Sequence, residues 1–125
     1  DTCLSIFENF FHIRGNEYTF NLKEIANYYN LYSDLLNYWK KIIHKNFFEI
    51  NYEEFIYNQK KNTKKLLEYC SLAWEDQCMN FHLTKRTVRT SSDNQVRQKI
   101  YTQSINKWKK YKEDLNDLMK IIDQH

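Results

Sequence analysis

The feature that most restricts the fold of this chain is a long run of apolar residues at helical spacing between Asn21 and Ile43. An apolar residue returns every three or four positions, so one face of a single helix collects them all. The residues on this face are Leu22, Ile25, Tyr29, Tyr32, Leu36, Trp39 and Ile43. Asn21 followed three residues later by Glu24 is typical of a capping box at a helix start. The sequence therefore predicts one long helix here, ending before a break at residues 44–46.

Residues 47–51, with the sequence FFEIN, are the best candidate for a strand because they are short and rich in aromatic and β-branched residues. The other periodic segments predict helices at 1–11, 52–55, 59–72 and 76–81, and a last helix capped by Ser104. One strand among helices makes a poor α/β domain by itself. It is better explained as the second half of one whose other strands lie upstream. We therefore expect an α/β fold, of which this chain is a C-terminal fragment.

The composition indicates one packed domain. The chain has 125 residues, of which 42% are apolar and 17% aromatic, which argues against a disordered protein. Neither a membrane-spanning run nor a signal peptide is visible in the sequence. The three cysteines (Cys3, Cys70 and Cys78) are odd in number and lack CxxC spacing. They also sit among apolar neighbours, so reduced, buried thiols and a cytoplasmic location are expected.

The strongest functional signal is a basic stretch from Thr84 to Lys112, which holds nine of the nineteen Lys and Arg residues but one acid, Asp93. Ten basic residues and fifteen acids lie elsewhere, so the overall charge of +3 conceals a basic and an acidic side. Cations attract anions at long range, and the interspersed Ser, Thr and Gln side chains supply directed hydrogen bonds. The stretch is therefore predicted to bind phosphate or sulfate groups.

Two other classes of protein fit the same composition. A nucleic-acid-binding helical module would use the basic stretch, with Tyr101, Trp108 and Tyr111 as stacking groups. A helical interaction protein would use its aromatic residues only as core. A metal site is not expected, since Cys78 and His82, four residues apart, lack a second pair of ligands in the sequence.

Four motifs, in order along the chain, resemble the C-terminal half of sulfotransferases that use 3′-phosphoadenosine 5′-phosphosulfate. They are DTCLS at 1–5, YEEF at 52–55, LLEYCSLAWED at 66–76 and SSDNQVRQKIYTQSINKW at 91–108. Within that family the chain most resembles the bacterial branch often fused to tetratricopeptide repeats, and the tyrosylprotein sulfotransferases. The resemblance covers nearly the whole chain.

The resemblance implies that residues 1–125 are the C-terminal, mostly helical portion of one sulfotransferase domain of the P-loop-kinase-like type, with the strand near 47–51. It implies transfer of a sulfuryl group from the donor nucleotide to an acceptor hydroxyl. No metal, nucleic acid or membrane would take part, and tetratricopeptide repeats would lie upstream. The phosphosulfate-binding loop and the catalytic base would precede Asp1, so this part alone is expected to be inactive.

Three residues outside the basic loop at 91–97 are expected to contact the donor. Ser5 matches the family's serine that hydrogen-bonds the 3′-phosphate. Tyr52 matches a donor-contacting tyrosine and directly follows the predicted strand, beyond whose carboxyl end ligands bind in open α/β sheets. Lys107 matches the lysine of the family's Lys-Trp pair. It lies in the first turn of the predicted last helix, where exposed N–H groups and the helix dipole would help it hold a phosphate.

The loop at 91–97 carries the predicted catalytic residue. The family has a serine near the bridging oxygen of the phosphosulfate, where it donates a hydrogen bond as charge builds on the leaving phosphate. Counting back from Gln95 favours Ser92 for this role, whereas the SSD triplet favours Ser91. We prefer Ser92 and place Ser91 in the donor site. Gln95 and Arg97 are expected to lie along the nucleotide, with Arg97 contacting a phosphate.

Overall fold

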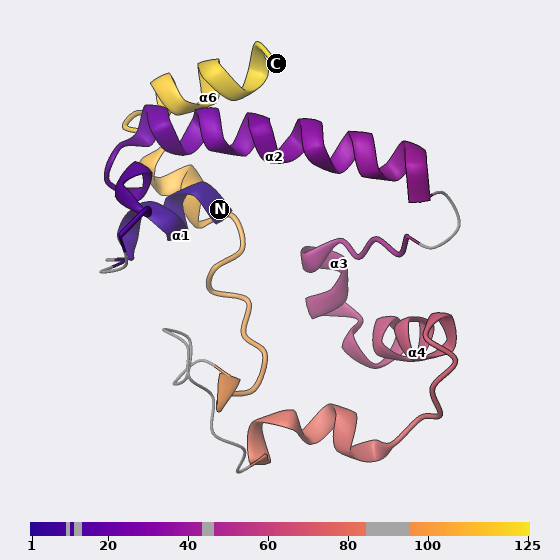
Figure 1. The fold of residues 1–125 in the computed structure, drawn as a ribbon. Coiled ribbons are helices and arrows are strands. Elements are labelled where there is room, and N and C mark those ends of the chain that lie inside the picture. Colours follow the sequence, from indigo (N-terminus) through magenta and orange to yellow (C-terminus); the bar gives the residue numbers. More distant parts are fainter. Residues whose placement is uncertain (10, 12–13, 44–46, 85–95) are drawn as a thin grey trace. The chain divides into compact units, whose positions relative to one another are not determined.

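The chain folds into two compact units. The structure, a computed structural model, describes residues 1–9, 11, 14–43, 47–84 and 96–125. The first unit consists of Asp1–Phe47 and Ser104–His125, and the second of Phe48–Gln103. In the element labels, η denotes a 3₁₀-helix. The first unit contains α1 (Thr2–Glu8), η1 (Glu17–Phe20), α2 (Leu22–Ile43), η4 (Lys107–Tyr111) and α6 (Asn116–Asp123). The second contains α3 (Tyr52–Tyr57), α4 (Gln59–Tyr69) and η3 (Asp76–Leu83), and Figure 1 labels the α-helices of both.

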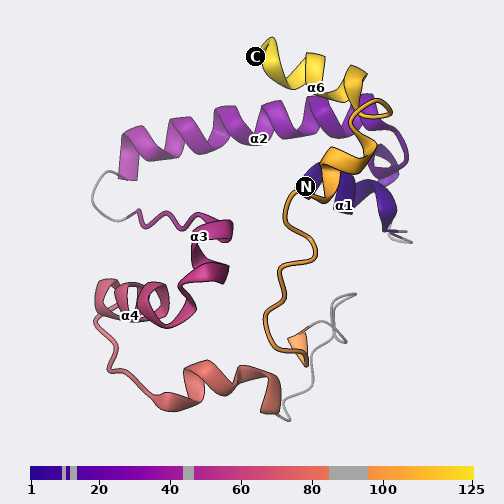
Figure 2. The ribbon, with the colours of Figure 1, turned by 180° about the vertical axis from the view of Figure 1, so that it is seen from behind.

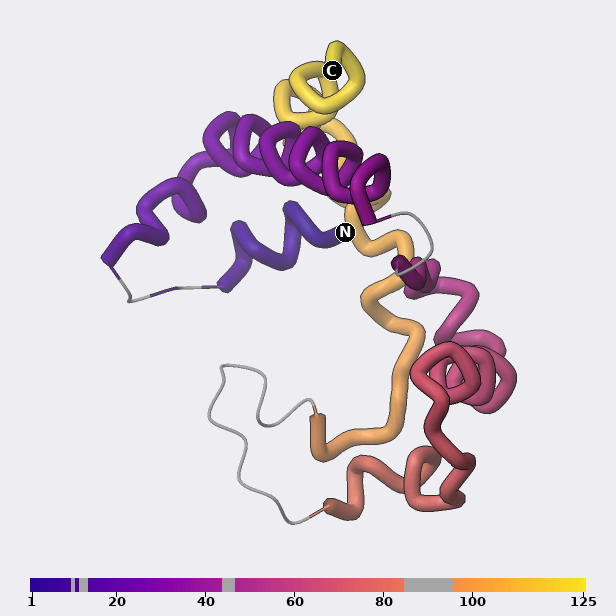
Figure 3. The backbone as a smooth tube through the Cα atoms, turned by 45° about the vertical axis from the view of Figure 1, so that its right-hand side comes forward, coloured from indigo at the N-terminus to yellow at the C-terminus, as the bar shows by residue number. Residues whose placement is uncertain are grey.

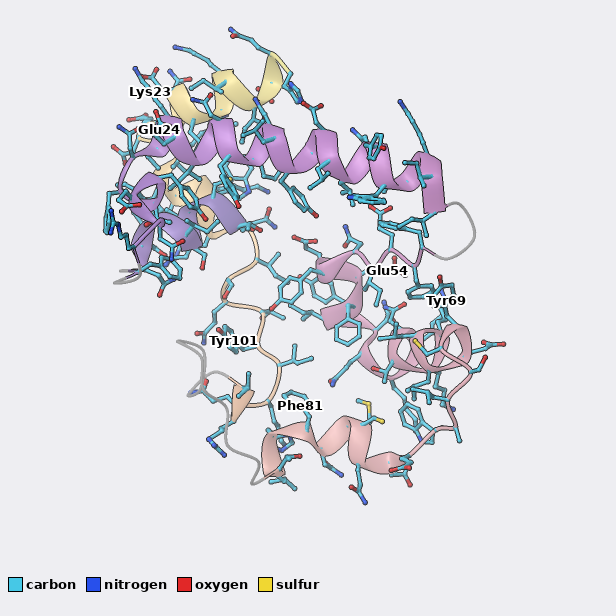
Figure 4. All side chains as sticks on the ribbon, viewed as in Figure 1. Lys23, Glu24, Glu54, Tyr69, Phe81 and Tyr101 are labelled. Atoms are coloured by element: carbon cyan, nitrogen blue, oxygen red, sulfur yellow. The ribbon has the colours of Figure 1, made fainter. Side chains whose placement is uncertain are left out.

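The long helix α2 begins where the capping pattern predicts. Asn21 Oδ1 accepts hydrogen bonds from the backbone N–H groups of Lys23 and Glu24, at 2.8 and 3.4 Å; both residues are labelled in Figure 4. These bonds satisfy two of the N–H groups that have no partner inside the first turn of a helix. The predicted start of this helix is therefore confirmed.

The core of the first unit joins the beginning of the chain to its end. Figures 1 and 2 show α6 lying along the first half of α2, with α1 packed on the same half. The buried residues come from all three segments: Leu4, Ile25, Ala26, Leu115 and Leu118. Asn30 Nδ2 also donates to the backbone carbonyl of Ile121, at 3.1 Å, across the α2–α6 contact. Segments far apart in the sequence are thus fixed against each other.

The apolar face of α2 is buried only along its first half. Ile25 is 1% exposed, whereas Tyr32 and Trp39, on the predicted face, are 53% and 44% exposed. The helical period fixes which residues share a face, but the length of the covering helices fixes how much of it is buried. The predicted face is therefore confirmed as a core surface in its first turn, at Leu22 and Ile25.

The second unit is organised around two consecutive helices. Asn51 Oδ1 accepts a hydrogen bond from the backbone N–H of Glu54, at 2.9 Å, and so caps α3. The carbonyl of Glu54, labelled in Figure 4, accepts from the side chain of the buried Asn62 in α4, at 3.0 Å. This bond gives the buried amide a partner, as a polar group removed from water requires. It fixes α3 against α4.

The α/β expectation is wrong for this chain. Residues 47–51, the predicted strand, have no regular secondary structure, and no strand occurs anywhere in the part of the chain that the structure describes. A strand is stable only when a neighbouring strand pairs with its N–H and C=O groups. No described segment offers that pairing, so aromatic and β-branched composition was not enough. The described fold is helical.

Candidate functional site

The candidate site of the first unit lies where the first helix meets the turn before η4. Asp1, Ser5 and Glu8 are spaced by four and three residues, so they share one face of α1. Both ends of this row contact residues 106–108. Asp1 accepts hydrogen bonds from the backbone N–H groups of Asn106, at 2.7 Å, and Trp108, at 3.0 Å. Ser5, which is exposed, lies between these two anchor points.

Lys107 completes this arrangement through an ion pair with Glu8. Its Nζ lies 2.7 and 2.5 Å from the two carboxylate oxygens of Glu8, on the row that contains Ser5. The hydrogen bond to this carboxylate raises the pKa of Lys107 above its ordinary value, so the amine stays protonated. Ser5, predicted to hold the 3′-phosphate, and Lys107, predicted to hold a phosphate, are therefore brought to the same face of α1.

The backbone around Lys107 is set by two features of its neighbours. Asn106 has a φ of 60°, in the left-handed region that asparagine tolerates better than most residues. Trp108 packs against the buried cluster of the first unit. The turn is thus held from both sides of Lys107. The sequence predicted one last helix capped by Ser104, but Asn106 precedes a 3₁₀-helix, and α6 begins at Asn116.

The second unit brings Tyr52 and the segment after Arg97 together. Tyr52 is the first residue of α3 and is 57% exposed. It borders a cavity of about 200 Å³, whose other lining residues are Phe81, Val96, Gln98, Lys99, Ile100 and Tyr101. Figure 4 labels Phe81 and Tyr101. The cavity has aromatic rings for a planar group and the Lys99 ammonium for an anion.

The position of Arg97 is described, but residues 91–95 of its loop are not. Its guanidinium donates to the carbonyl of Thr84, at 3.5 Å, which spans the two ends of the loop. Ser91, Ser92 and Gln95 lie outside the described residues. The predicted roles of these residues in catalysis and donor binding therefore stay predictions, as do those of Ser5, Tyr52, Arg97 and Lys107.

Sequence reasoning missed Asp1, Glu8 and Asn106. The signal for the first two was present, because they flank Ser5 at helical spacing on its own face. Nothing in the sequence indicated their partners, since Glu8 and Lys107 are 99 positions apart. Asn106 in the left-handed conformation could have been suggested by its frequency in turns.

No group of three or more His, Cys, Asp or Glu side chains among the described residues is arranged to hold a metal ion. None of the described helices combines the length and the apolar character that crossing a membrane requires.

Comparisons with known proteins place the chain among its relatives. Residues 1–76 match the profile of a family described as "Sulfotransferase family". A protein of Aquifex aeolicus (strain VF5), named only "Uncharacterized protein", is 31% identical over 107 residues, which cover 86% of this chain and 14% of that protein. The chain therefore spans about a seventh of the length of this relative. No solved structure matches it.

Proposed function

Because this chain belongs to the sulfotransferase family, we propose that it forms the donor-binding side of an enzyme that uses 3′-phosphoadenosine 5′-phosphosulfate. In the reaction, the acceptor hydroxyl oxygen bonds to sulfur while the bridging sulfur–oxygen bond to phosphate breaks. Adenosine 3′,5′-bisphosphate leaves, and the hydroxyl proton passes to a general base. The activity is proposed for the whole protein, to which this chain contributes binding groups.

The observation that carries the proposal is the shared location of Ser5 and Lys107. A phosphate needs a cation and hydroxyl or amide donors within one small region. Lys107 reaches α1 beside Ser5, on a row whose other members are fixed to the turn of Lys107. We assign these two residues to the 3′-phosphate of the donor. Since Glu8 pairs with Lys107 in the structure, a bound phosphate would compete with this carboxylate for the ammonium group.

The second unit supplies further donor contacts in this proposal. Tyr52 and the segment after Arg97 border one cavity, which supports a contact between this region and the nucleotide. Arg97 would bind a phosphate, Gln95 would lie along the nucleotide, and Ser92 would donate to the bridging oxygen, with Ser91 beside it. The motif at 91–108 supports these roles.

The finer placement within the family rests on the same motifs. We propose the bacterial branch that is fused upstream to tetratricopeptide repeats, related to the tyrosylprotein sulfotransferases, acting in the cytoplasm on a hydroxyl acceptor. The alternative of a nucleic-acid-binding module has no support from the family match. One of its stacking groups, Trp108, is packed against the core of the first unit.

Calorimetric titration of the complete protein with adenosine 3′,5′-bisphosphate tests this proposal. Lys107→Met should weaken binding about tenfold, and Ser5→Ala about threefold, because each removes a donor to a charged group. Lys110→Met, an exposed lysine three residues further on, is the matched control and should change affinity less than about twofold.

The same titrations with adenosine 5′-monophosphate assign the phosphate. If Ser5 and Lys107 hold the 3′-phosphate, neither substitution should weaken binding of this nucleotide, which lacks that group. Equal losses for both nucleotides would overturn the 3′-phosphate assignment. A complete protein that binds no bisphosphate would overturn the proposed function itself.

A further inference from the structure

Asp1 makes hydrogen bonds that an aspartate at its position does not ordinarily make. It precedes α1 as the N-cap, where a carboxylate usually accepts from N–H groups of its own helix. Here it makes no such bond. Its two oxygens instead accept from the backbone N–H groups of Asn106 and Trp108, at 2.7 and 3.0 Å. One side chain thus ties α1 to both sides of Lys107.

These bonds fix a backbone conformation that is otherwise costly. Asn106, with its φ of 60°, occupies a region that costs an L-residue about 1–2 kcal/mol, although asparagine pays less than most. Hydrogen bonds to a charged acceptor are roughly twice as strong as neutral ones, so the Asp1 carboxylate offsets this cost. Figures 1 and 3 both show the start of α1 beside the turn that directly precedes η4.

The direction of the Lys107 side chain follows from this anchoring. Lys107 lies between the two residues whose N–H groups Asp1 holds. With its backbone fixed there, its side chain forms an ion pair with Glu8, on the face of α1 that also carries Ser5. Without the Asp1 carboxylate, the turn would lose its backbone hydrogen bonds to α1, and Lys107 would sample other directions.

We infer that Asp1 is a positioning residue of the donor site: its carboxylate holds the turn at 106–108 so that Lys107 meets the 3′-phosphate beside Ser5. The inference rests on the proposed function and deepens it. Asp1 itself contacts no phosphate, since a carboxylate would repel that group. It acts only through the backbone on either side of Lys107.

The test compares Asp1→Ala and Asp1→Asn with a control of equal charge change. Asp123 is exposed and borders, with Asp1, a cavity of about 280 Å³, so Asp123→Asn removes a nearby negative charge without touching the turn. If Asp1 acted only by its charge, its removal would raise the affinity for adenosine 3′,5′-bisphosphate, as in the control. A positioning role predicts the opposite sign: a loss of about tenfold in Asp1→Ala.

Asp1→Asn keeps one acceptor oxygen and should lose about threefold in affinity, and it serves as the test should the alanine variant not fold. The ratio of the affinities for adenosine 3′,5′-bisphosphate and 5′-monophosphate must fall in both variants. A merely structural defect lowers the folded fraction and would weaken both nucleotides alike, leaving that ratio unchanged.

A double-mutant cycle with Lys107→Met separates the inference from the proposed function. In the Lys107→Met background, Asp1→Ala should change the affinity no further, because the residue through which it acts is gone. Independent losses in this cycle, or an unchanged nucleotide ratio in the single variants, would overturn the positioning role. If Lys107→Met alone has no effect on the bisphosphate, the proposed site fails instead.

Discussion

Lys107 Nζ lies 2.5 and 2.7 Å from the two carboxylate oxygens of Glu8, although 99 positions separate the residues in the sequence. The lysine has three N–H donors, of which the carboxylate takes at least two. The ion pair therefore restrains the cation that we assign to the donor. It also places a negative charge where a phosphate would have to bind.

Glu8→Gln is accordingly expected to strengthen the binding of adenosine 3′,5′-bisphosphate, by about threefold. The neutral amide no longer competes for the ammonium group, and a partly exposed ion pair contributes little. Calorimetric titration measures this gain. Glu24→Gln removes an exposed carboxylate of the same unit that is not part of this ion pair and is the control. A loss of affinity in Glu8→Gln would show that the glutamate assists binding.

The same ion pair predicts how stability responds to alkaline pH. Glu8 raises the pKa of Lys107 above its ordinary value of 10.5 in the folded chain. The stabilisation is therefore complete below that value and is lost as the pH rises through the raised pKa. The difference in melting temperature between the natural protein and Lys107→Met should be constant up to about pH 10 and shrink above it. A difference that grows with pH would contradict this sign.

Substitutions of Asn106 should follow the demands of its left-handed backbone. Asn106→Gly is expected to leave the melting temperature nearly unchanged, because glycine adopts a φ of 60° without steric cost. Asn106→Val should destabilise by about 1–2 kcal/mol, since a β-branched side chain is least compatible with this region. Thermal unfolding measures both. Equal stability of the two variants would mean that this turn does not keep its conformation.

The residue that caps α3 should contribute more to helix stability than the residue that precedes α4. Asn51→Ala removes the acceptor of the Glu54 N–H and should cost the helix about 1 kcal/mol. Asn58 occupies the corresponding position before α4 but makes no capping bond through its side chain, so Asn58→Ala is the matched control. Hydrogen exchange at the Glu54 amide should accelerate in the first variant alone. Comparable acceleration in both would count against this cap.

The cysteines should differ in reactivity. Burial raises the pKa of the Cys3 thiol, whereas Cys70 is exposed, so the expected burial of the cysteines is wrong for Cys70. Since the thiolate is the reactive form, iodoacetamide at mildly alkaline pH should modify Cys70 at least about threefold faster than Cys3. Peptide mass spectrometry resolves the two sites, and a Cys3→Ser variant confirms the assignment. Faster modification of Cys3 would be inconsistent with its burial.

Local patterns determined much of what the sequence could predict. The period of α2, its cap at Asn21 and the helix after Asn51 depend on contacts within a few residues, which the sequence displays directly. The strand at 47–51 failed for the opposite reason, because a strand depends on a partner elsewhere. The family was also readable, since the matched residues 1–76 include three of the four motifs.

The sequence by itself determined the long helix α2, the family and the candidates Ser5 and Lys107. Only the tertiary structure decided that Lys107 pairs with Glu8 on the face of α1 that carries Ser5, and that Asp1 binds the backbone on both sides of Lys107. The physical reason is the range of the interactions involved. Helical period and capping act over three or four residues, whereas an ion pair between residues 8 and 107 exists only once the core has placed both helical segments together.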